Sequence, residues 1–256
     1  MRYTANRVRN RRWPPARHNE MTIAAVAWLA VIAALIPRAA AAPSDHDHAV
    51  PQALAPGYSA LEFDPPAPGG YALPPLGKAA DGPVLDSSGK ARRLHDYLGD
   101  KLVVLSFIYT RCSDVNGCPL ATFVLKGVQD RILATPKLEG AVRLVSFSFD
   151  PWYDTPAVLN RYASHFRKPE FDWRFLTTHS EAEMRPILDA YGQWIVRDYD
   201  DAGNYLGTVS HLLRVYLIDR QLRVRNIYST SFLHADTVVN DLRTVLAQTR
   251  RDSNLE

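Results

Sequence analysis

The chain has 256 residues, of which 46% are hydrophobic and 22% charged, enough for one domain with an apolar core plus tails. Its formal net charge is +3, but residues 1–42 hold seven arginines and one glutamate, so the remainder has 23 basic and 26 acidic residues and a net charge of −3. The basic excess therefore belongs to the N-terminus, and composition argues against a nucleic-acid-binding protein.

The first 42 residues have the order of a secretory signal: an arginine-rich start, an uncharged run from Met21 to Ile36, and four alanines at 39–42. The apolar run is about 16 residues, shorter than the ~18–20 of a membrane span. The sequence predicts a signal peptide, with an uncleaved signal anchor that tethers the protein through residues 21–36 as the alternative. Either reading predicts an exported, periplasmic protein, which in the anchored case is held at the inner membrane. Met1 and Met21 are alternative starts.

Residues 43–71 are rich in proline, alanine and glycine and predict a linker. Inside it, the tract Asp-His-Asp-His at 45–48 offers metal-binding side chains, although a solvated polar patch is the more common meaning of such a tract. We expect the folded domain at residues 72–250 and a short tail at 251–256.

Both cysteines lie between a buried strand and a helix. The apolar, β-branched run from Leu102 to Ile108 predicts a central strand, and a helix is expected to begin at Pro119. The expected buried face of this helix is Leu120, Phe123, Val124, Val128 and Ile132. Because a helix N-terminus has unpaired N–H groups and a positive dipole end, we expect the pKa of Cys118 to lie below the roughly 8.5 of a free thiol.

The rest of the domain alternates between the two kinds of element. Strands are expected at 142–149, 173–176, 209–219 and 222–228, helices at 156–166, 181–191 and 235–248, and hairpins at 84–90 and 198–207, with one helical turn at 93–98. Either Asp154 or Thr155 caps the helix that begins at Pro156. This order predicts an α/β fold, a thioredoxin-like sandwich with a central mixed sheet flanked by helices and an inserted hairpin before the strand that carries His211.

Three motifs in order resemble the Sco/SenC family of copper chaperones, over about Pro83 to the C-terminal helix. They are YTRCSD at 109–114 with CPL at 118–120, SFDP at 148–151 with DTP at 154–156, and SH at 210–211 with YLID at 216–219. The resemblance implies an exported, often membrane-tethered, thioredoxin-like domain. It further implies a role in assembling the binuclear copper centre of a respiratory oxidase, with a copper-acceptor protein such as an oxidase subunit as partner.

By the same motifs, the resemblance places the copper ligands on Cys112, Cys118 and His211. Two thiolates and an imidazole form a soft, low-coordinate set that suits Cu(I), with Cu(II) as a further state, whereas structural zinc normally has four protein ligands. Here five residues separate the cysteines where the family usually has three. We expect the two additional positions, near Asn116 and Gly117, to loosen the loop.

Other polar residues have weaker support. Asp114 lies between the cysteines, and Asp150 and Asp154 lie in the second motif, so each is a candidate for supporting the site. Four more histidines match no motif and are expected to be structural or solvated: His95, His165, His179 and His234.

Three alternatives use the same cysteines. A thiol–disulfide oxidoreductase with Cys112 and Cys118 as its redox pair would act on the cysteines of a copper-acceptor protein, its thiol–disulfide partner, although the usual C-x-x-C spacing is absent. A purely structural disulfide is the second, in an exported protein. A peroxidase of the same fold would have Thr or Ser three residues before its cysteine and Pro seven before, where this chain has Tyr109 and Leu105, which argues against it.

Overall fold

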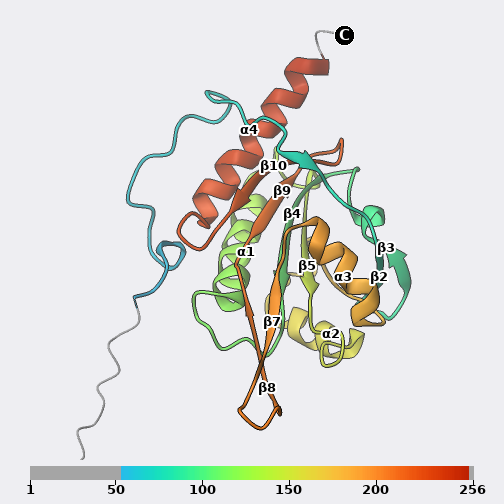
Figure 1. Ribbon diagram of the computed structural model, residues 1–256. Helices are drawn as coiled ribbons and strands as arrows, with labels where there is room; N and C mark the ends of the chain where they lie inside the picture. The colour runs from blue at the N-terminus through green and yellow to red at the C-terminus, as the bar shows by residue number, and fades with distance from the viewer. Residues whose placement is uncertain (1–52, 254–256) are drawn as a thin grey trace, which may run out of the picture. The chain divides into compact units, whose positions relative to one another are not determined.

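The computed structural model describes residues 53–253 (Figure 1). The predicted leader, the tract at 45–48 and the first part of the predicted linker lie outside this range. Within residues 53–253, no helix has the length and apolar content needed to cross a bilayer.

An eight-stranded mixed sheet forms the centre of the fold, in the order β1-β10-β9-β4-β5-β6-β2-β3 (Figure 1). Its strands are β1 Gly77–Lys78, β2 Pro83–Asp86, β3 Ala91–Arg93, β4 Leu102–Ile108, β5 Val142–Ser148, β6 Trp173–Thr177, β9 Val215–Ile218 and β10 Arg223–Tyr228. β4, β5 and β6 are parallel to one another, whereas β9 is antiparallel to β4. Every residue of β4 and β5 is buried, as expected for strands covered on both faces.

Helices pack against this sheet. They are α1 Cys118–Leu133, α2 Pro156–Ser164, α3 Glu181–Ala190 and α4 Ala235–Ser253, with 3₁₀ turns η1 at Pro56–Tyr58 and η2 at Leu94–Tyr97. α1 packs along α4, and α2 lies beside α1 through a 2.9 Å hydrogen bond between Thr122 and Tyr162. α3 packs on β2, and Tyr191 at its end contacts Phe107 of β4. The predicted mixed sheet with flanking helices is confirmed.

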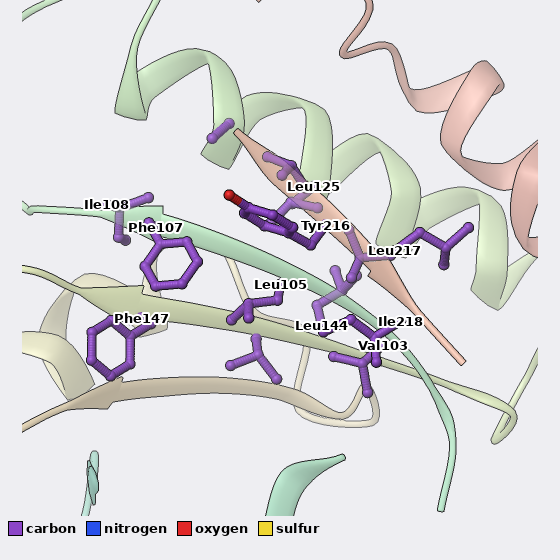
Figure 2. Packing of buried hydrophobic residues seen from close by; sticks show 14 of the residues in the cluster. Val103, Leu105, Phe107, Ile108, Leu125, Leu144, Phe147, Tyr216, Leu217 and Ile218 are labelled. Carbon is purple, nitrogen blue, oxygen red and sulfur yellow. The ribbon is translucent and has the colours of Figure 1, made fainter. Parts of the chain in front are cut away.

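The core joins the central strands to β9 and α1 (Figure 2). Its labelled members are Val103, Leu105, Phe107, Ile108, Leu125, Leu144, Phe147, Tyr216, Leu217 and Ile218, all at most 2% exposed. This packing fixes the ends of β4 and β5, where the loops that carry the candidate site begin. Phe123, expected on the buried face of α1, is instead 50% exposed.

The segment that carries His211 differs from its prediction. One strand was expected over 209–219, but β8 Tyr205–His211 pairs only with β7 Ile195–Tyr199 in a separate two-stranded sheet, and β9 starts at Val215. Residues 212–214 pass from one sheet to the other, and Arg214 donates a hydrogen bond to the carbonyl oxygen of Gly192. The prediction of one strand is wrong. The residues of β8 and β9 both have strand-like composition, and nothing in the sequence between them marks the break.

The described part of the predicted linker lies against the domain. The Tyr71 hydroxyl donates a 2.5 Å hydrogen bond to Asp241 of α4, and Asn240 of the same helix donates to the carbonyl oxygen of Pro66. Within residues 53–71, η1 is the only helix or strand, but the segment still forms hydrogen bonds to the domain. Residues 53–71 therefore pack against the domain, whereas their composition predicted a linker.

Candidate metal centre

The loop between β4 and α1 carries both cysteines. Cys118 is the first residue of α1, and Pro119 follows it at a position where its missing N–H leaves no donor unpaired. Asp114 shapes the loop, since its side chain accepts a hydrogen bond from the Asn116 N–H and its carbonyl oxygen accepts one from the Gly117 N–H. Asp114, a candidate for supporting the site, thus orients the loop that carries the cysteines.

Cys118 and His211 lie in direct contact. The distance from Cys118 Sγ to His211 Nε2 is 3.5 Å, and the backbone N–H of Tyr109 donates to the same sulfur at 3.4 Å. His211, at the end of β8, packs its ring against Phe149 with 4.8 Å between centroids and against Tyr109 with 6.1 Å. The structure thus brings one sulfur and one ring nitrogen together from distant parts of the chain.

Cys112 lies on the same loop and is half-buried, with its Sγ 4.0 Å from the carbonyl oxygen of Asp114. Its side chain interacts with that of Cys118, and both residues are free thiols. In the range 53–253, no three His, Cys, Asp or Glu side chains already converge as a metal site. Of the three predicted ligands, Cys118 and His211 therefore lie in contact, and Cys112 lies beside Cys118.

The two thiols differ in acidity. The hydrogen bond with Cys118 lowers the pKa of Cys112 to about 6, even though burial opposes this shift. Burial, followed by the neighbouring Cys112, raises the pKa of Cys118 well above its usual value. The prediction of a lowered pKa for Cys118 is wrong. Its side chain is 1% exposed, and the effect of desolvation on the pKa outweighs that of the helix N-terminus. Cys118 shares the buried face of α1 with Ala121 and Leu125, three and seven residues on, which was the signal in the sequence for its burial.

Burial lowers the pKa of His211, and a hydrogen bond with the Val209 carbonyl oxygen partly opposes that shift. The imidazole is therefore neutral at neutral pH. Nδ1 lies 3.4 Å from the Val209 carbonyl oxygen, so a proton on Nδ1 is satisfied there and leaves the lone pair of Nε2 facing Cys118. A neutral imidazole with this orientation can act as a metal ligand.

Asp154 joins the two loops beneath the site. It is fully buried and accepts hydrogen bonds from the N–H and hydroxyl of Thr110 and, at 2.5 Å, from the hydroxyl of Ser148. Thr155 caps α2 by accepting from the Val158 N–H, so Thr155 is the confirmed helix cap and Asp154 is not. Asp154 instead ties the residues before Cys112 to the end of β5.

Asp150 forms ion pairs with Arg111 and Arg197, neither of which was among the predicted site residues. Arg111 donates to its carboxylate at 2.8 Å, and Arg197 of β7 lies 3.9 Å from the other carboxylate oxygen. The ion pairs link the cysteine loop to the hairpin that carries His211. Arg111 was visible as the neighbour of Cys112 in the first motif, whereas nothing in the sequence pattern distinguished Arg197.

Aromatic rings cover both guanidinium groups. Arg111 lies 4.1 Å from the centroid of Tyr153, and Arg197 lies 4.1 Å from that of Trp152. Trp152 and Tyr153 remain 63% and 42% exposed.

The histidines His95, His165 and His234 bind backbone carbonyl oxygens elsewhere in the fold.

Curated relatives share part of the chain. It is 31% identical over 100 residues to the SCO1 protein homolog of Bacillus subtilis, covering 39% of this chain and 48% of that protein. It is 29% identical over 138 residues to the SCO2-like protein of Rickettsia felis, covering 53% of this chain and 62% of that protein. The matches thus span about half to three-fifths of the length of these relatives.

Solved structures show the same fold. The solution structure of apo Sco1 from Thermus thermophilus has a TM-score of 0.56 at 30% identity, covering 69% of this chain and 95% of that one. Bradyrhizobium japonicum ScoI with copper bound has a TM-score of 0.52 at 27% identity, covering 65% and 98%. These likenesses confirm the thioredoxin-like sandwich. A model of the SCO1/SenC family matches residues 83–247, and the chain therefore belongs to the SCO1/SenC family.

Proposed function

We propose that this protein is an exported copper-binding metallochaperone that assists assembly of the copper centre of a respiratory oxidase. Copper is held by Cys112, Cys118 and His211 and passes by ligand exchange to an acceptor protein such as an oxidase subunit. The observation that carries the proposal is the 3.5 Å contact between Cys118 Sγ and His211 Nε2, with Cys112 on the same loop. Support comes from the copper-bound Bradyrhizobium relative and from BsSco, which is described as a member of the Sco family of cytochrome c oxidase assembly proteins.

The donors fit copper in their chemistry. Cys112, with a pKa of about 6, supplies a thiolate at neutral pH, and His211 supplies a neutral nitrogen. Cys118 is protonated before binding and must give up its proton to become a ligand, so copper uptake releases a proton from this chain. The soft sulfur donors favour Cu(I), and the nitrogen also suits Cu(II).

The location is proposed from the N-terminal pattern. A signal in residues 1–42 would deliver the domain to the periplasm, and an uncleaved apolar run at 21–36 would hold it at the inner membrane. Sequencing the N-terminus of the exported protein distinguishes a cleaved signal from an anchor.

A Cu(I) titration against a competing chelator tests the proposal on the full, reduced chain. We expect one-to-one binding in the wild type and at least tenfold weaker binding in Cys112→Ala, Cys118→Ala and His211→Ala. His165→Ala is the matched control, because His165 is an exposed histidine bound to the Arg161 carbonyl oxygen, and it should bind Cu(I) as the wild type does. Wild-type affinity in His211→Ala would show that the nitrogen is not a ligand and contradict the proposed site.

A second function is favoured by the unequal thiols. Cys112 is half-exposed and acidic and Cys118 is buried and protonated, which suits thiol–disulfide exchange with the cysteines of a copper-acceptor protein. The Cys112 thiolate would attack the partner's disulfide and form a mixed disulfide. The sulfur of Cys118 would then displace the partner as a thiol, leaving a Cys112–Cys118 disulfide. Cys118→Ala should accumulate the mixed disulfide, and failure to trap it would contradict this second function.

A further inference from the structure

The spacer between the cysteines is bonded to residues 53–59, which we call the strap. The side-chain oxygen of Asn116 accepts a 2.7 Å hydrogen bond from the Ala55 N–H, and its side-chain nitrogen donates at 3.2 Å to the Ala53 carbonyl oxygen. The Asn116 side chain thus acts both as acceptor and as donor in hydrogen bonds with the strap backbone. The expectation that the positions near Asn116 loosen the loop is contradicted by these bonds.

Tyr58 makes the second connection. Its hydroxyl donates a 2.5 Å hydrogen bond to the carbonyl oxygen of Val115, and its ring packs on Phe123 of α1 with 4.9 Å between centroids. Phe123 is half-exposed on α1, and the strap covers one side of its ring. Tyr58 therefore joins the strap to the loop and to the helix that begins with Cys118.

The strap itself has a closely fitted seat. Gly57 is buried between α1 and the residues before α4, where an added Cβ would lie 2.2 Å from the Leu233 carbonyl oxygen and 3.0 Å from Val124. The Ser59 carbonyl oxygen lies 3.0 Å from His234 Nε2. A segment held this closely can transmit its own position to the loop that it binds.

The other hydrogen bonds of the spacer span only two to four residues: Asn116 and Gly117 donate to Asp114, and Ala121 of α1 donates to the Gly117 carbonyl oxygen. These bonds shape the turn and join its end to α1, but they do not fix the position of the Cys112 side of the spacer. The hydrogen bonds that Ala55 donates to Asn116 and Tyr58 donates to Val115 span 61 and 57 residues, and they fix this position.

We infer that Asn116 and Tyr58 are positioning residues, through which the strap holds the spacer so that Cys112 stays beside Cys118. The inference rests on the proposed function only in taking the two cysteines as its working residues. It assigns to residues outside the matched motifs a part in setting the distance between the two sulfurs. Loosening the strap should lower the effective concentration of one thiol toward the other.

The test is the equilibrium of the full chain with glutathione, in which the protein dithiol and glutathione disulfide give the Cys112–Cys118 disulfide and two reduced glutathiones. Asn116→Ala combined with Tyr58→Phe removes the bonds to the spacer and keeps the Tyr58 ring. We expect the equilibrium constant for disulfide formation to fall at least threefold, and Asn116→Asp, which still accepts from Ala55, to restore part of it in the Tyr58→Phe background.

The matched control is Asn240→Ala with Tyr71→Phe. These changes remove the same chemical groups and also free the N-terminal segment from α4, but away from the loop. We expect this variant to lose stability while keeping the wild-type equilibrium constant. An unchanged constant in the strap variant, or an equal fall in the control, overturns the inference. Absence of Cu(I) binding by the wild type would instead overturn the proposed function, since the glutathione measurement contains no copper.

Discussion

Cys118 Sγ and His211 Nε2 lie 3.5 Å apart although 93 positions separate them in the chain. One atom comes from the first residue of a helix and the other from the last residue of a hairpin strand. Because each is placed by different elements, the pair exists only after the sheet, α1 and the hairpin have all packed. Unfolding of any one of these elements should therefore separate the sulfur from the nitrogen.

The unequal pKa values of the thiols predict unequal reactivity. Iodoacetamide should alkylate Cys112 with a half-maximal rate near pH 6, because the hydrogen bond with Cys118 stabilises its thiolate, while Cys118 should react only on unfolding. Cys118→Ala removes that bond and should move the midpoint up by about one pH unit or more. Mass spectrometry of the alkylated sites measures both effects. A wild-type midpoint near the ordinary thiol value would refute the prediction.

Removing the Asp154 carboxylate should destabilise the fold. Asp154→Ala leaves the buried Ser148 hydroxyl and the half-buried donors of Thr110 without their acceptor, at a cost of about 1–3 kcal/mol for each donor that stays unsatisfied. Thr155→Ala, which removes only the exposed cap of α2, should cost about 1 kcal/mol. Urea unfolding of both variants provides the comparison. If Thr155→Ala proves the more damaging, Asp154 does not have the structural part assigned to it.

Asp172 should make stability depend on pH. Burial alone would raise its pKa, but hydrogen bonds from Lys101 and Arg174 and the charge of Arg143 lower it to about 2. Because the pKa of Asp172 is lower in the folded state than in the unfolded state, its ionised carboxylate stabilises the folded form above pH ~4. That contribution, about 2 kcal/mol, is lost as the pH falls from ~4 to ~2. Asp172→Asn should be less stable at neutral pH and lose less between these values, as followed by unfolding at each pH. A parallel pH dependence in the two proteins would contradict this assignment.

The seat of the strap predicts a position where only glycine fits. Gly57→Ala should displace the strap and cost about 1–3 kcal/mol, because its Cβ would meet the Leu233 carbonyl oxygen at 2.2 Å. Gly77→Ala is the control, since a Cβ there meets no atom within 4 Å. Thermal unfolding should show a lower midpoint for Gly57→Ala alone. Equal midpoints for the two variants would mean that the strap adjusts without cost.

Much of the fold followed from patterns that depend on local sequence. The apolar run at Leu102–Ile108 became β4, the turn residues at 84–90 became the β2–β3 hairpin, and the motifs marked the residues that became the Cys118–His211 contact. These patterns succeed because strand burial and turn chemistry are properties of short segments.

The predictions that failed concern features that depend on packing between distant segments. The acidity of the thiols was assigned to the helix N-terminus, but burial of Cys118 by the whole core decides it. The prolines and glycines of residues 53–71 gave no sign of a surface that would bind them, and the seat around Gly57 is built from residues far along the chain. Arg197 could not be singled out, because only the folded hairpin brings it to Asp150 and Trp152.

The separate two-stranded sheet also makes His211 sensitive to a distant turn. Ile195 pairs with His211 at the open end of the hairpin, and Asp200 organises the closed end by accepting hydrogen bonds from Ala202 and Asn204. Neighbouring residues of a strand face opposite sides, so sliding β8 by one position would turn the imidazole away from Cys118 and bring Ser210 or Leu212 into its place, depending on the direction of the slide. The length of the turn at 200–204 therefore encodes which side chain faces the sulfur. A single deletion there would remove the nitrogen donor while leaving both cysteines untouched.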